Sequence, residues 1–234
     1  FYGRGSAAHT QYLQARNFIR ADDGERALAA LRRSTQSDPA YYPSLLRTAQ
    51  MHHQRAVAPA ALSSYRETLA ACSNHPAALR GLAVLYQEAG QTRSAQRAQE
   101  QLWRVLAPLA ERERQREDWT NVATVTRYVL DALPAHRAAQ LMHADALTRL
   151  GLYDDASAML WEMSGATSTD VEMLAAWARL CEAIDADTRV LVLQSEPAGW
   201  LARADAAWAA VLQLAPRDPQ ALLARARLAV RAGD

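Results

Sequence analysis

Lysine is missing from this sequence: all 26 of its basic residues are arginine, set against 25 acidic residues, for a formal net charge of +1 at pH 7. We interpret the missing lysine as the codon bias of a GC-rich genome and not as a chemical requirement. The two signs are scattered along the chain, so we expect no field that would gather nucleic acid or an anionic membrane surface. Nucleic acid is therefore not an expected partner.

Cysteine is also scarce, with only Cys72 and Cys181. Two cysteines are too few for a disulfide framework, so both are predicted to be buried thiols. The longest aliphatic run, Val190 to Leu193, is far shorter than the roughly 18 residues that a membrane-spanning helix needs. No charged-then-apolar leader is found. We expect a soluble protein, with the cytoplasm and the periplasm as open alternatives.

Glycine, proline and phenylalanine are few, with nine, nine and two residues, while 50% of the chain is hydrophobic. Alanine and leucine supply most of the apolar residues, and β-branched residues are rare. This balance favours helix over strand, and the apolar share is large enough to bury a core. The composition predicts an all-α protein.

Alanine recurs at a fixed interval of 34 residues, at Ala15, Ala49 and Ala83. A second series, twelve residues downstream, keeps the same interval: Ala27, Ala61 and Ala95. After a break, the first series resumes as Ala110, Ala144 and Ala178, and the second then falls on Val122, Ala156 and Val190. Two series with one period indicate tandem repeats.

Each repeat fits two helices joined by a short turn. Leu79, Leu82, Ala83 and Tyr86 share one helical face, and Gly90 ends that helix. The next helix is marked by Ala95, Ala98 and Leu102. Helices that cross at close range leave room only for small residues at the crossing, which explains the alanines.

This pattern resembles the tetratricopeptide repeat, a 34-residue unit with a large apolar residue, Leu-Gly or Leu-Ala, Tyr, Gly, Ala and a closing Pro at set spacings. Pro39, Pro134 and Pro216 match the closing Pro. The resemblance implies an all-α, right-handed α-solenoid of tandem antiparallel helix pairs. We expect residues 1–7 to be a linker or tag, and 8–234 to be a single solenoid with repeats near 8–41, 42–75, 76–102, 103–136, 137–170 and 171–218.

One interval is shorter than the period. Ala83 and Ala110 are 27 residues apart, so two turns of helix are missing between them. Either both helices of that repeat are shortened, or they join into one long helix bent near Pro108.

Another interval is longer. Ala178 and Ala226 are 48 residues apart, which predicts an insertion near 185–198. Because a bare loop would expose its aliphatic run, we expect a short helix from Asp187 to Gln194. The alternative is that residues of the parent chain are omitted here.

The last residues, 219–234, are predicted to form a half repeat. Leu222, Ala226 and Ala229 occupy the packing positions of a first helix, and Gly233 the turn that follows it. Such a helix is made to receive a second one. We therefore favour continuation of the array in a longer parent protein, with a terminal cap as the alternative.

Known catalytic motifs are absent: there is no Gly-x-Ser-x-Gly, no Gly-rich phosphate loop before a lysine and no His-Glu-x-x-His. Cys72 and His75 have a spacing that can share a metal, but a second pair is lacking, which favours a structural role. We interpret the charged run 111–118 as a solvated helix face and the six tryptophans mainly as core, with Trp200 left open. The sequence predicts no enzyme, no cofactor and no metal.

The resemblance places binding on the concave face, which the first helix of each repeat lines. Carried over by position, the predicted partner-binding residues are Tyr12, Arg16, Arg20, Arg47, Gln50, His53, Arg80 and Gln87. They give the first three repeats a basic, amide-rich groove. Later repeats offer a mixed set: Glu111, Arg114, Asp145, Arg149 and Arg179. The alternative is that all of these are ordinary exposed polar residues.

Some members of the family clamp the C-terminal carboxylate of a peptide with lysine and asparagine. This chain has Arg16 at the asparagine position and no lysine, which argues against that function. We expect instead a bacterial, non-enzymatic interaction scaffold whose groove binds an acidic peptide or partner-protein segment. Open alternatives are a periplasmic scaffold subunit of polysaccharide export, secretion or pilus assembly, an accessory domain of a larger enzyme, and self-association into a larger complex.

Overall fold

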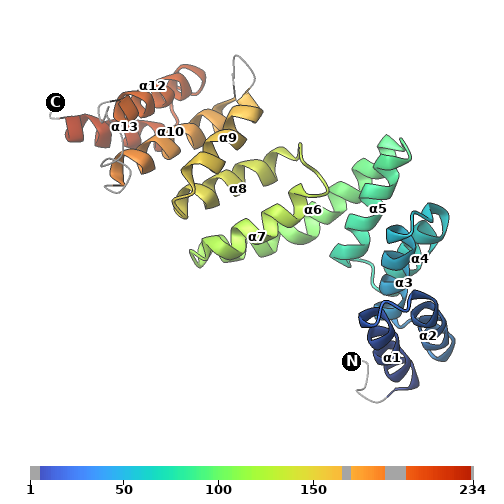
Figure 1. Ribbon diagram of the computed structural model, residues 1–234. Helices are drawn as coiled ribbons and strands as arrows, with labels where there is room; N and C mark the ends of the chain where they lie inside the picture. The colour runs from blue at the N-terminus through green and yellow to red at the C-terminus, as the bar shows by residue number, and fades with distance from the viewer. Residues whose placement is uncertain (1–5, 165–169, 188–198, 233–234) are drawn as a thin grey trace. The chain divides into compact units, whose positions relative to one another are not determined.

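The structure is a computed structural model that describes residues 6–164, 170–187 and 199–232 (Figure 1). All regular secondary structure in these ranges is α-helical, which confirms the predicted all-α class. Across the same ranges, every helix is too short or too polar to cross a bilayer. Packing divides the chain into two compact units: unit 1, Phe1–Ala107, and unit 2, Pro108–Asp234. The handedness of the array and the repeat bounds stay predictions.

Unit 1 is a row of antiparallel helices. Its elements are α1 (Ala7–Arg20), α2 (Gly24–Ser37), α3 (Tyr42–Gln54), α4 (Ala58–Ala71), α5 (Pro76–Glu88) and the first part of α6 (Thr92–Gln115). From α1 to α5, each helix packs on the next, and α3 also contacts α5. Figure 1 shows the pairs α1/α2 and α3/α4 as antiparallel hairpins.

The short interval in the alanine series corresponds to one continuous helix. α6 runs for 24 residues through Pro108, so the two helices join into one, as in the second of the two alternatives predicted for this region. The bend near Pro108 stays a prediction. Proline has no N–H to donate to the carbonyl four residues earlier, here that of Arg104. The boundary between the two units therefore falls where the helix lacks one of its own hydrogen bonds.

Unit 2 repeats the arrangement. After the end of α6 come α7 (Trp119–Leu130), α8 (Arg137–Arg149), α9 (Tyr153–Ser164), α10 (Val171–Ala186), α12 (Gly199–Leu214) and α13 (Pro219–Ala232). Successive helices from α7 to α13 pack on one another, and α8 also contacts α10. The predicted insertion helix from Asp187 to Gln194 lies outside the described residues except for Asp187, which is the C-cap of α10. The predicted turn at Gly233 lies outside them too.

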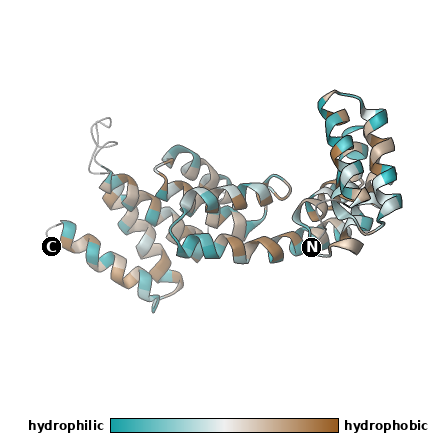
Figure 2. Cartoon of the chain, turned by 90° about the horizontal axis from the view of Figure 1, so that it is seen from below, coloured by the Kyte–Doolittle hydropathy of each residue, from teal (hydrophilic) through white to brown (hydrophobic). Residues whose placement is uncertain are grey.

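The alanine marks of the sequence are the buried crossing points of the helices. Exposure is at most 4% for all of these residues: Ala15, Ala27, Ala49, Ala61, Ala83, Ala95, Ala110, Val122, Ala144, Ala156 and Ala178. In Figure 2, hydrophobic and hydrophilic residues are interleaved along the helices, as expected where one face of a helix is buried and the other solvated.

The terminal helix α13 packs on α12 with one face and leaves another face exposed. Ala221, Ala224 and Leu228 are its buried residues. Leu222, Ala226 and Ala229 are exposed. They are the residues that the sequence predicts on the face made to receive a second helix, and the binding of such a helix stays a prediction.

The turns inside the helix pairs share one backbone conformation. Asp22, Ala56, Gly90, Glu117 and Gly151 all have φ between 56° and 76°. They keep the 34-residue interval within each series. In each turn the next residue donates its N–H to a carbonyl five residues back, the Schellman arrangement that ends a helix. The helix pairs thus close in the same way whether or not the turn residue is glycine.

Gly81 on α5 is required by packing. A Cβ added there would lie 2.2 Å from Cζ of Tyr65, a residue of α4 that is only 3% exposed. The tyrosine ring therefore fills the space that a side chain at position 81 would need. It joins α4 and α5 in a core cluster with Ala61, Leu82 and others.

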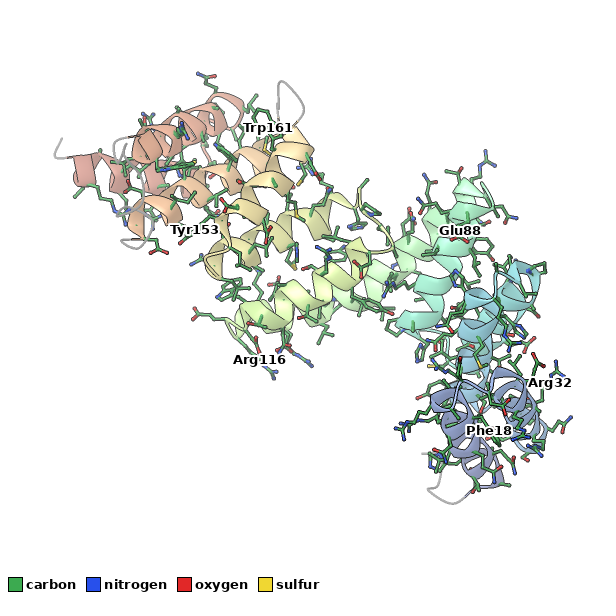
Figure 3. The ribbon with its side chains drawn as sticks, viewed as in Figure 1. Phe18, Arg32, Glu88, Arg116, Tyr153 and Trp161 are labelled. Atoms are coloured by element: carbon green, nitrogen blue, oxygen red, sulfur yellow. The ribbon has the colours of Figure 1, made fainter. Side chains whose placement is uncertain are left out.

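Three sequence interpretations are wrong in detail. Cys72 is only half-buried, although Cys181 is buried as predicted. Trp161, labelled on α9 in Figure 3, is 75% exposed and so is not a core residue. Glu113, inside the run interpreted as solvated, is 8% exposed, and its carboxylate accepts from Arg112 Nε and Nη2 at 3.0 and 2.9 Å.

Candidate functional site

Unit 1 contains a groove between α1 and α3, the first helices of its first two pairs. Its volume is about 530 Å³, and we call it the unit 1 groove. The lining residues are Tyr12, Arg16, Ile19, Arg20, Tyr42, Pro43, Leu46, Arg47 and Gln50. Five of the eight predicted partner-binding residues therefore lie together: Tyr12, Arg16, Arg20, Arg47 and Gln50.

Helix geometry explains why these residues meet. On α1, Tyr12, Arg16 and Arg20 are four residues apart and so lie along one face. On α3, Leu46 and Gln50 have the same relation. The neighbouring Ala15 and Ala49 are fully buried, which fixes the rotation of each helix and turns both faces toward the groove.

The polar lining of the unit 1 groove is positive. It includes three arginines and no acidic residue. Arg16 and Arg20 are exposed, and Arg47 is half-buried. Arg47 Nη1 donates to Oε1 of Gln50 at 3.1 Å, which leaves the amide nitrogen of Gln50 able to donate to a ligand. The groove can thus take carboxylates on guanidinium groups and a backbone carbonyl on the amide.

Aromatic contacts hold one wall of the groove in place. The ring of Tyr12 meets the edge of Tyr41, with the centroids 5.9 Å apart. Tyr41 is 3% exposed, and its hydroxyl lies 2.8 Å from Nδ1 of His9. Because Tyr41 is itself fixed by burial and by this hydrogen bond, Tyr12 presents a pre-positioned apolar surface to the groove.

The other three predicted residues lie elsewhere in unit 1. The ring of His53 turns to α4, with Nδ1 3.3 Å from the hydroxyl of Tyr65 and the two rings edge to face. Arg80 is half-buried and Gln87 exposed, both on α5, and neither lines the groove. The sequence reading missed its apolar lining residues Ile19, Pro43 and Leu46.

Unit 2 contains two adjoining hollows, whose lining residues come mainly from α6, α8, α10, α12 and α13. The first, which we call the apolar trough, has a volume of about 400 Å³ and includes Leu141, Met142, Val171, Ala175 and Val211. Its charged lining residues are Glu111, Arg114, Asp145, Glu172, Arg179 and Asp218.

The second hollow, which we call the arginine pocket, has a volume of about 450 Å³. Its lining residues are Asp145, Thr148, Arg149, Arg179, Glu182, Ala183, Trp208, Gln220, Leu223, Arg227 and Arg231. Asp145, Arg179, Trp208 and Gln220 line both hollows, so the two are continuous. All five later residues of the mixed set predicted from the sequence lie in one hollow or the other.

Cys72 and His75 have a spacing that can share a metal, but no group of three or more candidate metal ligands is found among the described residues. His75 is the N-cap residue before α5, and its Nδ1 is a buried atom without a hydrogen-bond partner. Burial lowers the pKa of this ring below the usual value for histidine. The ring of this half-buried histidine packs beside Tyr42, with the centroids 5.3 Å apart.

No family model matches the chain, and no curated protein matches its sequence. Similar solved structures are mostly tetratricopeptide repeat proteins. One from Parabacteroides merdae is 14% identical, with 94% of this chain and 98% of that one covered and a TM-score of 0.40. PilF of Pseudomonas aeruginosa is 15% identical, with 94% and 97% covered and a TM-score of 0.40.

A thermophilic repeat protein of Thermus thermophilus is 20% identical, with 96% of this chain and 98% of that one covered and a TM-score of 0.35. All three TM-scores are below 0.5, so no conclusion about this chain rests on these likenesses. The tetratricopeptide-like helix pairs are recognised from the chain's own 34-residue period, its buried alanines and its repeated turns.

Proposed function

We propose that the chain is a protein-interaction scaffold that binds an acidic segment of a partner protein in the unit 1 groove. The observation that carries the proposal is the lining of that groove, which includes three arginines, two tyrosines and no carboxylate. A groove with this lining suits a peptide segment with acidic side chains.

The lining also indicates how the binding energy divides. Exposed arginine–carboxylate pairs contribute roughly 0.2–1 kcal/mol each, so they contribute more to specificity for an acidic ligand than to affinity. The tyrosines with Pro43 and Leu46 supply apolar surface for a side chain of the peptide. We therefore expect an affinity on the order of micromolar that weakens as salt is added.

The test is a selection of random peptides displayed on phage against the full chain, followed by titration of the selected peptides by fluorescence anisotropy. Selected sequences should be enriched in aspartate and glutamate, and their Glu→Gln analogues should bind at least about tenfold more weakly. Reversing two groove charges with Arg16→Glu and Arg47→Glu should weaken binding by a similar factor.

The matched control reverses two arginines outside the groove. Arg32 and Arg33 on α2 are exposed and do not line it, and Arg32 is labelled at the edge of that helix pair in Figure 3. Arg32→Glu with Arg33→Glu makes the same change in net charge and should leave binding unchanged. Equal losses in both variants, or selected peptides without acidic residues, would rule out the groove.

The alternatives of an export, secretion or pilus subunit and of an accessory domain of an enzyme stay predictions, because no described residue favours either over a general scaffold. The charge and apolar lining of the unit 1 groove are compatible with a protein partner in each of these settings.

A further inference from the structure

The arginine pocket of unit 2 concentrates positive charge from three helices. Arg149 comes from α8, Arg179 from α10, and Arg227 with Arg231 from α13. These four arginines face two carboxylates in the lining, Asp145 and Glu182.

Both carboxylates in the pocket already have partners. Asp145 Oδ1 lies 3.8 Å from Nε of Arg179, and Glu182 Oε1 accepts the indole N–H of Trp208 at 2.5 Å. Arg149 lies over the ring of Trp119 at 5.3 Å, a contact that orients the guanidinium without neutralising it. The lining thus keeps an excess of positive charge.

The two arginines of α13 in the pocket repel each other. Arg227 and Arg231 are four residues apart, where like charges repel on a helix by a few tenths of a kcal/mol. Arg225, between them and the start of the helix, turns to the other side and pairs with Asp205 at 2.7 Å. An anion in the pocket would relieve the repulsion between Arg227 and Arg231.

The adjoining apolar trough differs from the arginine pocket because its charged side chains do not leave an excess of positive charge. Its carboxylates are engaged: Glu111 takes two hydrogen bonds from Arg114, both at 2.8 Å, and Glu172 pairs with Arg137 at 3.0 Å. Asp218 accepts from the backbone N–H of Ala221 at 2.8 Å. The apolar lining residues of the trough take no part in these pairs, so they are the surface that it offers to an uncharged side chain.

We propose that the arginine pocket and the apolar trough form a second binding site, which takes a partner segment with two acidic residues near a bulky apolar residue. The carboxylates lie against Arg149, Arg227 and Arg231, and the apolar side chain enters the trough beside Leu141, Met142 and Val171. This site differs from the unit 1 groove in its position and in demanding an apolar residue next to the acidic ones.

The test uses fluorescein-labelled ten-residue peptides built on glycine and serine, with two adjacent glutamates and one leucine placed one to four residues further on. At least one spacing should bind the full chain. Replacing both glutamates with glutamine, or the leucine with serine, should weaken binding by at least about tenfold. Failure of all spacings, or analogues that bind as well as the parent peptide, would overturn the proposal.

The variants locate the site. Arg227→Glu with Arg231→Glu, and separately Arg149→Glu on another helix, should each weaken binding about tenfold, with helical content by circular dichroism unchanged. The matched control is Arg93→Glu with Arg97→Glu, an exposed pair on α6 with the same four-residue spacing, which should bind as the unaltered chain does. If the control variant lost as much peptide binding as the pocket variants, the loss would be due to the change in net charge alone. That result would overturn the proposed site.

Two further outcomes separate this site from other occupants. Loss of these peptides in Arg16→Glu with Arg47→Glu, and not in the unit 2 variants, would place them in the unit 1 groove and overturn the second site alone. Displacement by inorganic phosphate beyond that by sodium chloride at equal ionic strength would show a simple anion site and also overturn the proposal. The expected result is equal displacement by the two salts.

Discussion

At the scale of single residues, the fold lowers the pKa of three histidine rings, and His143 is the most deeply buried of them, at 5% exposure. Burial is the main cause for all three, and the charge of Arg127 adds to it for His143. Thr126 Oγ1 lies 2.7 Å from the carbonyl of Val122 and 2.8 Å from Nδ1 of His143. The hydroxyl donates to the carbonyl and so accepts from the neutral ring.

The protein should therefore lose stability as the pH falls below about 6.5, the pKa of histidine in an unfolded chain. In that range the histidines of the unfolded chain bind protons, whereas the buried rings of the folded chain stay neutral. This difference lowers the free energy of unfolding. Urea midpoints measured above and below this pH should differ less in His143→Gln than in the unaltered chain. His52→Gln, on α3, is the control, and a difference unchanged in His143→Gln would contradict the prediction.

Residue by residue, the sequence located the unit 1 groove but not its full chemistry. Arg16, Arg20 and Arg47 could be predicted because each lies at a known spacing from a buried alanine of the same helix. That spacing determines the direction in which the side chain leaves the helix. His53 has a comparable offset, yet the hydroxyl of Tyr65 draws its ring to α4. The apolar lining residues were missed because an apolar side chain near such an offset is usually a packing residue.

At the scale of elements, the turn residue with positive φ has a consequence for stability. Gly90 has no atom near the site of an added Cβ, so Gly90→Ala tests backbone conformation alone. An L-residue in this region costs about 1 kcal/mol, and we expect that loss of stability in chemical denaturation. The converse change, Ala56→Gly, removes the same strain at φ 56° and should stabilise by less than about 1 kcal/mol, because glycine also loosens the unfolded chain. Two changes of the same sign would contradict this account.

Sequence reading identified the helix pairs but only some of their turns. Gly90 and Gly151 are visible as turn signals, whereas Asp22, Ala56 and Glu117 adopt the same conformation without glycine. At these three turns the hydrogen bonds at the end of the helix hold the residue at a positive φ that its own conformational preference disfavours. The path of α6 through Pro108 could not be decided either, because proline both ends helices and is tolerated where one bond is lost.

At the scale of the whole molecule, the helices from α1 to α5 and from α7 to α13 make their contacts mainly with sequence neighbours. Stability in such an array is a sum of local terms, so damage should stay near its origin. The period and the buried alanines therefore predicted the fold well. The chemistry of the grooves was harder to predict, because each lining is drawn from helices about one repeat apart in sequence.

Gly81→Ala tests this locality. The new methyl group would collide with the ring of Tyr65, at a cost of roughly 1–3 kcal/mol. Hydrogen exchange should quicken in α3, α4 and α5 and stay unchanged from α8 to α13. In a Tyr65→Leu background the collision is gone, and the same change should become neutral or stabilising, since alanine favours helix over glycine by about 1 kcal/mol. Equal quickening along the whole chain would contradict the local account.

The arginine lining of the unit 1 groove has a consequence for any titration of binding there. Guanidinium groups do not lose their proton in proteins, and the groove lining includes no carboxylate and no histidine, so its positive charge does not change over the pH range in which carboxyl groups titrate. Any pH dependence of complex formation in this groove, once unfolding is excluded, therefore belongs to the bound segment. The groove would keep a constant charge during the titration. The midpoint of the curve of binding against pH would then give the pKa of the carboxyl groups of the partner.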